Sequence, residues 1–166
     1  MFTDLAPPQS LDPVVIVLIG IPLSGKDTWI RQYAPNNFEV ISRDNFITQN
    51  GSGSYRLDYN KHSSKMVDKL FFNALNQASQ SLKNVIVNAT HLTKARRRRV
   101  LLRFSNHYKI ALVFPVLDIV AFTSRNEERK NSEGKYIPTS VYHKMVSLYE
   151  PVSDEENFDR VHFLGV

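Results

Sequence analysis

An aliphatic run that leads into a loop with two glycines and a lysine constrains this chain more than any other feature. The run Val14–Ile19 has six aliphatic side chains without a polar interruption, as expected of a strand buried on both faces of a sheet. The segment Gly20–Thr28 follows directly and reads GIPLSGKDT. A strand buried on both faces needs helices to cover it. The segment therefore predicts a strand, a loop and a helix within an α/β fold.

Each part of this loop has a mechanical reason to bind phosphate. Gly20 and Gly25 permit the positive-φ backbone and the close approach that point N–H groups at phosphate oxygens. Lys26 can bridge the β- and γ-phosphates, and the N-terminus of the next helix adds partial positive charge. A strand before and a helix after form the context expected of a nucleotide-binding P-loop. The expected nucleotide contacts are Gly20, Ser24, Gly25, Lys26, Asp27 and Thr28.

The bound nucleotide is expected to be ATP or another nucleoside triphosphate, accompanied by Mg²⁺. Where Ser or Thr usually follows the lysine and holds the metal, this chain has Asp27 and then Thr28. Both side chains offer oxygen, the ligand that Mg²⁺ prefers, so the two are alternatives. The absence of cysteine and the scatter of the five histidines argue against a zinc site. Lys26 is expected to be catalytic and to lie in solvent until a nucleotide binds.

The rest of the chain alternates strands with helices. Further strands are expected at residues 38–42, 84–88, 109–116 and 160–164, and helices at 27–34, 58–82, 93–106 and 139–150. Residues 48–56 are expected to form a surface loop. This order predicts a doubly wound, mostly parallel sheet with helices on both faces, the P-loop kinase fold. Residues 1–166 are expected to form a single domain, with a small helical lid at about 123–137.

Composition limits the class of protein. At 166 residues, with 42% hydrophobic and 22% charged residues, the chain has the make-up of a soluble globular domain. Its longest apolar run is too short to cross a membrane, and its first residues do not resemble a signal peptide. We therefore expect a cytoplasmic protein without a membrane partner. The net charge of +5 weakly favours a polyanionic partner.

The end of the second predicted strand carries a candidate catalytic base. Arg43 and Asp44 directly follow this strand, and ligands of open α/β sheets bind at the carboxyl ends of the strands. The two residues are therefore expected to face the P-loop. Asp44 is suited to accept a proton from an attacking hydroxyl. Capping of a helix that begins near Asn45 is the competing role for this carboxylate.

The third predicted strand ends in Asn88, Ala89, Thr90 and His91, without an acidic residue. Asn88 is the nearest oxygen ligand by position, and Arg43, Asn88 and Thr90 are expected to contact the substrate. For Thr90 and His91, a hydrogen-bonded cluster at the strand end is the alternative role. The four arginines Arg96–Arg99 point around most of a helix. We expect them to form a solvated, partly salt-bridged face, from which one or two guide a nucleic acid strand by its phosphates.

The predicted lid carries two further candidates. Arg125 and Arg129 are four residues apart on a polar helix and therefore share one face. In that position they are suited to neutralise the charge that develops on a transferred phosphoryl group. Surface pairing with Glu128 or Glu133 is the alternative role.

Taken in order, these segments resemble the kinase domain of the bacteriophage polynucleotide kinases, from the first strand to about Glu150. The matching segments are Gly20–Lys26, Ser42-Arg43-Asp44, Val85–Val87, Thr90-His91-Leu92, Ala95-Arg96-Arg97, Arg125-Asn126, Arg129, Gly134 and Ile137-Pro138. The lid correspondence is the most specific, because lids vary freely among P-loop kinases. The resemblance implies that Asp44 activates a 5′-hydroxyl and that Arg125 and Arg129 act in catalysis.

Three positions depart from that family. Asp27 replaces a serine, Ile47 stands where the family has an arginine that engages substrate phosphate, and Ala89 stands where it has an acidic residue. Arg43 or Arg56 are candidates to compensate for the missing arginine. The donor half therefore matches well and the acceptor half is altered.

The leading functional prediction is a polynucleotide 5′-hydroxyl kinase that moves the γ-phosphate of ATP to a 5′-OH end of DNA or RNA, as in end repair. The expected partner is the 5′ end of a nucleic acid, and a phage-encoded chain would work in the host cytoplasm. One alternative is a kinase for another hydroxyl, on a hydroxymethylated base in phage DNA, a nucleoside, a nucleotide or a small molecule. The other alternative is a non-catalytic NTP-binding module. The sequence sets no expectation for protein partners or oligomeric state.

Overall fold

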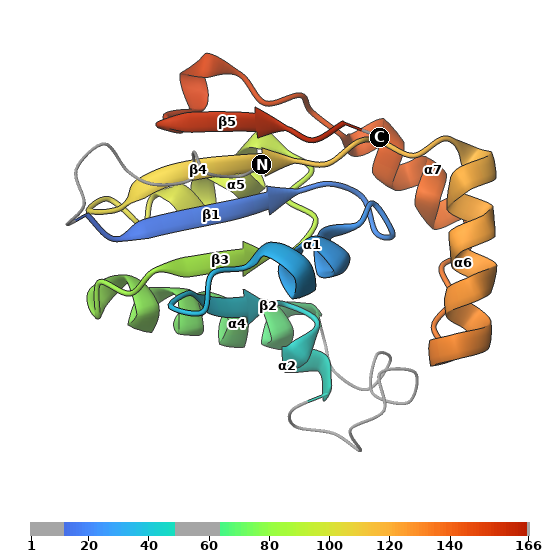
Figure 1. Cartoon of the computed structure of the whole chain (residues 1–166), viewed down its shortest axis with the longest axis horizontal. Coiled ribbons are helices and arrows are strands. Elements are labelled where there is room, and N and C mark those ends of the chain that lie inside the picture. The colour runs from blue at the N-terminus through green and yellow to red at the C-terminus, as the bar shows by residue number, and fades with distance from the viewer. Residues whose placement is uncertain (1–11, 49–63, 166) are drawn as a thin grey trace.

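The sheet consists of five parallel strands. The computed structural model describes residues 12–48 and 64–165 (Figure 1). Its strands are β1 (Val14–Ile19), β2 (Glu39–Ser42), β3 (Val85–Asn88), β4 (Tyr108–Val113) and β5 (Arg160–Phe163). Their order is β2-β3-β1-β4-β5, and every neighbouring pair is parallel. The predicted α/β P-loop kinase fold is confirmed, with a sheet that is wholly parallel.

The helices lie close to their predicted positions. They are α1 (Lys26–Tyr33), α2 (Asn45–Thr48), α4 (Ser64–Gln80), α5 (Lys94–Leu101), α6 (Ile119–Glu133) and α7 (Thr139–Leu148), with a short 3₁₀ helix η1 (Asp154–Glu156). Helix α5 ends five residues before its predicted end at 106, because the chain turns after Leu101 and brings Phe104 into the core, where it is fully buried. The predicted loop beyond residue 48, with Arg56, and the predicted helical residues 58–63 lie outside the described residues.

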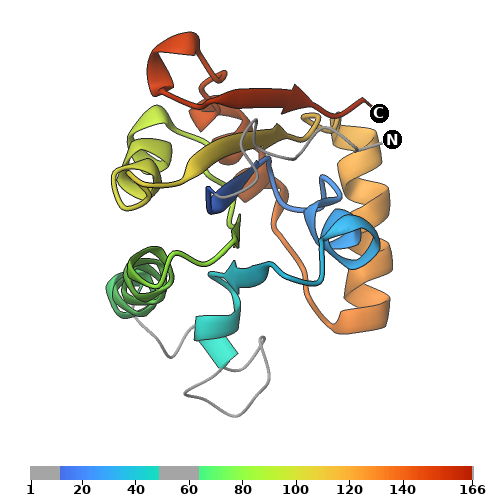
Figure 2. The ribbon, with the colours of Figure 1, turned by 60° about the vertical axis from the view of Figure 1, so that its left-hand side comes forward.

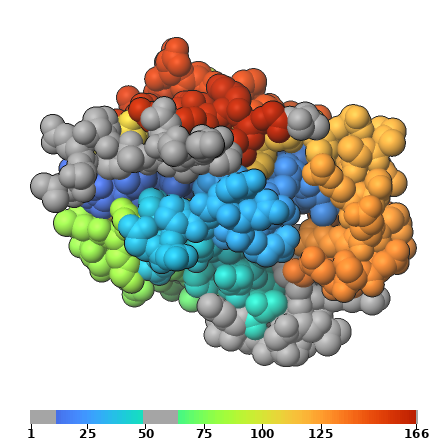
Figure 3. Space-filling view, viewed as in Figure 1, coloured from blue at the N-terminus to red at the C-terminus, as the bar shows by residue number. Residues whose placement is uncertain are grey.

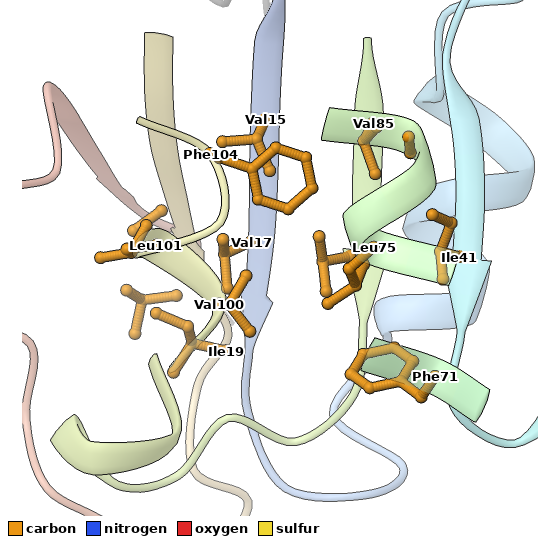
Figure 4. Close-up of a cluster of buried hydrophobic side chains, with 14 residues drawn as sticks. Val15, Val17, Ile19, Ile41, Phe71, Leu75, Val85, Val100, Leu101 and Phe104 are labelled. Carbon is orange, nitrogen blue, oxygen red and sulfur yellow. The ribbon is translucent and has the colours of Figure 1, made fainter. Parts of the chain in front are cut away.

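The sheet is covered on both faces, as the aliphatic run in β1 predicts. Helices α4 and α5 lie on one face and α1 on the other (Figure 2). Val15, Val17 and Ile19 pack toward α4 and α5, where Figure 4 shows them opposite side chains of both helices. The intervening residues of β1 join the cluster around Trp29 of α1. None of the six β1 side chains is more than 3% exposed.

The lid helices stand at the carboxyl edge of the sheet. Helix α6 lies across the ends of the strands, and α7 returns beside it (Figure 1). A third apolar cluster holds them there, formed by Ile21, Leu92, Leu117, Phe122 and Tyr142. Since Ile21 and Leu92 follow β1 and β3, the lid packs directly on the strand-end loops. None of the described helices is both long and apolar enough to cross a membrane.

Arg97 corrects the expectation of a solvated arginine face. Arg96, Arg98 and Arg99 are exposed, but the side chain of Arg97 is fully buried. Its guanidinium donates to both carboxylate oxygens of Glu156, at 2.6 and 2.8 Å. It also donates to the main-chain carbonyls of His91, Leu92, Glu150 and Pro151. Arg97 therefore joins the loop after β3 to the segment before β5.

Glu156 is fixed from two sides. One of its carboxylate oxygens also accepts the main-chain N–H of Ser153 at 3.0 Å. Burial by itself raises the pKa of the Glu156 carboxyl, but the hydrogen bonds from Arg97 and Ser153 outweigh this effect and hold the pKa below its ordinary value. The ion pair therefore stabilises the fold at neutral pH.

Glu156→Gln is expected to destabilise the protein by about 3–5 kcal/mol, because it leaves the buried guanidinium without its counter-charge. The folded pKa of Glu156 lies below its ordinary 4.5, so this contribution is present above pH 4.5 and is lost as the pH falls through the lowered pKa. Urea unfolding at neutral and at acidic pH measures both effects. Glu155→Gln, at the exposed neighbouring position, is the matched control, and equal stability of the two variants would contradict the assignment.

Candidate functional site

The P-loop between β1 and α1 has the backbone of a phosphate cradle. Gly25, which caps α1, has φ of +103°, a conformation that favours glycine. Gly20 is needed for space instead, because a Cβ there would lie 2.7 Å from Ser24 Oγ and 2.9 Å from Phe114 Cβ. The second left-handed residue of the loop is Leu23, with φ of +67°. The two glycines thus do different work, one conformational and one steric.

Lys26 is buried, and the expectation that it lies in solvent is wrong. Its side chain folds back over the loop, and its ammonium donates to the carbonyls of Gly20 and Ile21 at 2.9 and 2.7 Å. Ser24 Oγ accepts a third, longer hydrogen bond of 3.4 Å. Desolvation lowers the pKa of Lys26 to about 8, against the opposing pull of Asp27 and Asp44. The ammonium therefore occupies the centre of the loop before any phosphate arrives.

Asp27 joins the first helix to the end of β3. Its Oδ1 accepts a hydrogen bond of 2.9 Å from the Asn88 side-chain amide, which also lies 3.4 Å from Ser42 Oγ. Asn88 is buried, whereas Asp27 is exposed at the start of α1. The structure thus brings Asp27, the altered position of the P-loop motif, together with the ends of β2 and β3.

The oxygen groups here fit a magnesium ion better than a transition metal. Within residues 12–48 and 64–165, no three His, Cys, Asp or Glu side chains cluster to form a metal site. Mg²⁺ suits such a place, because it is commonly held by one or two protein oxygens together with substrate phosphates and water. Asp27 lies among the strand ends, while Thr28 Oγ1 accepts a hydrogen bond from Arg31 further along α1 at 3.3 Å. This arrangement favours Asp27 over Thr28 as the metal ligand.

Asp44, at the start of α2, lies at the same edge of the sheet. The residue remains exposed, but protein atoms around its carboxyl displace enough water to raise the pKa. The negative charge of Asp27 raises the pKa further, while Arg129, Arg43 and Lys135 act in the opposite direction. Asp44 therefore lies within electrostatic range of both the P-loop and the lid, and it is a stronger base than an ordinary aspartate.

Other acceptor-side candidates have mainly structural contacts. Arg43 donates to Asp68 of α4 at 2.7 Å and to Ser64 at 3.2 Å, so its guanidinium is held by α4. Ile47 is buried in α2, and Ala89 packs against the core beneath α4 and α5. At both altered positions the side chain therefore packs into the hydrophobic core.

The loop after β3 supports the P-loop by its main chain. The carbonyl of Thr90 accepts the N–H of Gly20 at 3.0 Å. His91 is buried with φ of +47°, and its Nδ1–H donates to the carbonyl of Leu18 at 2.8 Å. Desolvation lowers the pKa of His91 to about 4, so the ring is neutral at physiological pH. Asn88 and Thr90 are thus found beside the P-loop.

The lid brings both of its arginines to the P-loop. Arg125 donates to the carbonyl of Leu23 at 2.9 Å, across 102 residues of sequence. The side chain of Arg129 is only 17% exposed, and its charge acts on both Lys26 and Asp44. The alternative role also exists, because Arg129 Nε lies 3.4 Å from Glu133.

Two lid residues escaped the sequence reasoning. Lys135 acts on the carboxyl of Asp44 and lies 3.4 Å from Glu133. A cation directly after Gly134, which ends α6 with φ of +66°, was the available signal. Asn126, noted only as part of the resemblance, is buried and bonds both the N–H and the carbonyl of Ile137, at 3.1 and 2.7 Å. It closes the turn between α6 and α7.

Residues 15–152 match the family model described as an AAA domain (AAA_33), and the chain belongs to this family. It is therefore a P-loop domain of the NTP-dependent kinase type. The chain is also 27% identical over 172 residues to heterogeneous nuclear ribonucleoprotein U-like protein 2 of Mus musculus. That alignment covers 95% of this chain but 22% of the relative, so the chain spans about a fifth of the curated relative's length.

Solved structures share the fold. A chain of the Pnkp1/Rnl/Hen1 RNA repair complex matches with a TM-score of 0.66 and 24% identity, over 82% of this chain and 44% of that one. A putative kinase from Chloroflexus aurantiacus matches with a TM-score of 0.69 and 14% identity, over 92% of this chain and 85% of that one. At these identities the similarity establishes the architecture alone.

Replacement of Lys26 is expected to abolish phosphoryl transfer while the chain still folds. Lys26→Met removes the charge that would meet the transferred phosphate, which costs about 3 kcal/mol or more of barrier. Triphosphate binding should also favour the charged ammonium, whose pKa in the free protein is about 8. Calorimetry at about pH 8 in two buffers of different ionisation enthalpy should therefore show proton uptake in wild type only. Binding without proton uptake in wild type would contradict the contact.

The metal ligand can be identified by titration. Asp27→Asn is expected to raise the Mg²⁺ concentration needed for half-maximal activity, because a charged oxygen ligand is lost. Thr28→Val is expected to change it little, since the Thr28 hydroxyl bonds within α1. The opposite ranking would assign the metal to Thr28, and no effect in either variant would place it elsewhere.

Proposed function

We propose that this chain transfers the γ-phosphoryl group of ATP to a 5′-hydroxyl at the end of a nucleic acid. The observation that carries the proposal is the position of Asp44. A carboxylate with a raised pKa lies at the strand ends, within electrostatic reach of the P-loop lysine and of Arg129 in the lid. A domain that only bound nucleotide would have no use for a base at this position.

The chemistry follows from these groups. An oxygen of the acceptor hydroxyl forms a bond to the γ-phosphorus, the bond from that phosphorus to the β–γ bridging oxygen breaks, and ADP leaves. Asp44 accepts the hydroxyl proton. Lys26, Arg125 and Arg129 are suited to neutralise negative charge on the phosphoryl oxygens. Asp27 would hold Mg²⁺, which would supply further positive charge to the triphosphate.

Two observations support a polynucleotide as the acceptor. The lid sequence from Arg125 to Pro138 has the pattern of the phage polynucleotide kinases, and the structure brings both of its arginines to the P-loop. In addition, the curated relative is named heterogeneous nuclear ribonucleoprotein U-like protein 2, and one structural neighbour is a chain of an RNA repair complex.

A kinase for another hydroxyl is the second candidate. Ile47 and Ala89 favour it. They stand where the phage polynucleotide kinases have an arginine and an acidic residue, and here they pack into the core. A nucleoside or small-molecule acceptor would have less need of those polar contacts.

Asp44→Asn is expected to slow transfer to a 5′-hydroxyl oligonucleotide by about 10²–10⁴-fold, the usual cost of losing a general base. The amide keeps the shape of the side chain, so ATP binding should persist. In wild type the rate should fall as the pH drops through the raised pKa of Asp44, giving an acidic limb above the range of an ordinary aspartate. Single-turnover assays with labelled ATP across pH measure both effects.

Asp154→Asn, at an exposed position in η1, is the matched control and should transfer at the wild-type rate. Full activity of Asp44→Asn would refute the role of Asp44 as base. Equal phosphorylation of nucleosides and oligonucleotides by wild type would refute the polynucleotide acceptor and favour the second candidate. Absence of transfer to any acceptor would leave only nucleotide binding.

A further inference from the structure

A basic groove separates α4 from α5 on the face of the sheet that these helices cover. It has a volume of about 410 Å³ and is open to solvent. Its charged lining consists of Lys65, Asp68 and Lys69 of α4, Arg99 of α5 and Arg103 of the following turn, with Phe72 between the helices. The two helices lie side by side on one face of the sheet, opposite α1 (Figure 2), and Figure 3 shows the α1 face instead.

The positive charge of this groove is not compensated. Within the described part of the chain, none of its two lysines and two arginines forms an ion pair. Its single carboxylate, Asp68, is already paired with Arg43 at 2.7 Å. The groove therefore carries four cations, of which Lys65, Lys69 and Arg99 are exposed and Arg103 is half-buried, and such a concentration of like charge attracts a polyanion.

Phe72 holds the two arginines close together. The guanidinium carbons of Arg99 and Arg103 each lie 4.3 Å from the centre of its ring, at cation–π distance. Desolvation and the neighbouring charge of Arg99 both lower the pKa of Arg103. The like charges of the two guanidinium groups repel each other, and a bound anion relieves that repulsion.

The groove also leads toward the candidate active site. Lys65 and Asp68 lie in the first turns of α4, and Asp68 binds Arg43, the residue directly before Asp44. Helix α4 then runs away from this point toward the turn that carries Arg103. One end of the groove is thus connected, through the Asp68–Arg43 ion pair, to the residue that precedes the candidate base.

We propose that the groove between α4 and α5 binds the phosphodiester backbone of a single-stranded nucleic acid, whose 5′ end is presented to Asp44. This inference rests on the proposed function and deepens it, because it gives the enzyme a reason to prefer a polynucleotide over a nucleoside. Lysine and arginine contact the phosphates, so binding depends on strand charge and not on base sequence.

The test compares two double variants that each remove two positive charges. Lys65→Gln/Lys69→Gln alters the groove, and Lys94→Gln/Lys144→Gln alters exposed positions outside it. Binding of a fluorescent single strand of about 15 nucleotides is measured without ATP over a range of salt concentrations. The groove variant should bind more weakly, with a salt slope reduced by about 1.4, or about 0.7 for each lost phosphate contact. The control variant should keep the wild-type slope.

Kinetics with two acceptors provide the second readout. The groove variant should raise the KM for a 5′-hydroxyl oligonucleotide and leave the KM for a nucleoside 3′-phosphate unchanged, because the short acceptor does not reach the groove. Equal binding by the groove and control variants would overturn the inference, whether or not transfer occurs. A groove-dependent slope without any transfer would sustain the groove and refute the proposed function. Displacement of the strand by polyglutamate at equal charge would identify an acidic polypeptide as the occupant and overturn it.

Discussion

The site depends on the hydrogen bonds that anchor β1 to a neighbour on each side. Strand β1 pairs in parallel with β3 and with β4, and both ladders continue past its end. The N–H of Gly20 bonds to the carbonyl of Thr90, and the N–H of Phe114 bonds to the carbonyl of Ile19, at 3.0 and 2.8 Å. The P-loop is therefore held at its base from both directions. Because the strand order reverses around β1, the crevice for a ligand opens at the same place.

Charge at this edge is balanced between the loop, the strand ends and the lid. Desolvation lowers the pKa of Lys26, while the nearby carboxylates of Asp27 and Asp44 oppose that effect. Desolvation and the charge of Asp27 raise the pKa of Asp44. A triphosphate entering between these groups would meet a cation that already donates to two loop carbonyls and to Ser24 Oγ. The free energy of ligand binding then includes the exchange of those carbonyls for phosphate oxygens.

The sequence was sufficient for the architecture because hydrophobic periodicity and the P-loop motif are local signals. It failed where a side chain's partners come from distant segments. The burial of Arg97 left a trace in the sequence, since positions 97, 100 and 101 form one buried face of α5. Its partner Glu156, whose charge compensates the buried guanidinium, lies 59 residues away. No sequence pattern indicated that Lys26 folds back onto the carbonyls of its own loop. The roles of Asp44 and the lid arginines remain predictions, and the structure places these residues at the same edge of the sheet.

The turn closed by Asn126 makes α6 and α7 a single mechanical unit. Its amide bonds both main-chain groups of Ile137, and the rings of Phe122 and Tyr142 pack 4.5 Å apart between the helices. The hairpin is covalently linked to the sheet through the connections at 114–118 and 149–159, and it also packs on the strand-end loops through Ile21 and Leu92. Arg125 and Arg129 lie on the same helix of this unit, so a displacement of the hairpin would carry both arginines together relative to the P-loop.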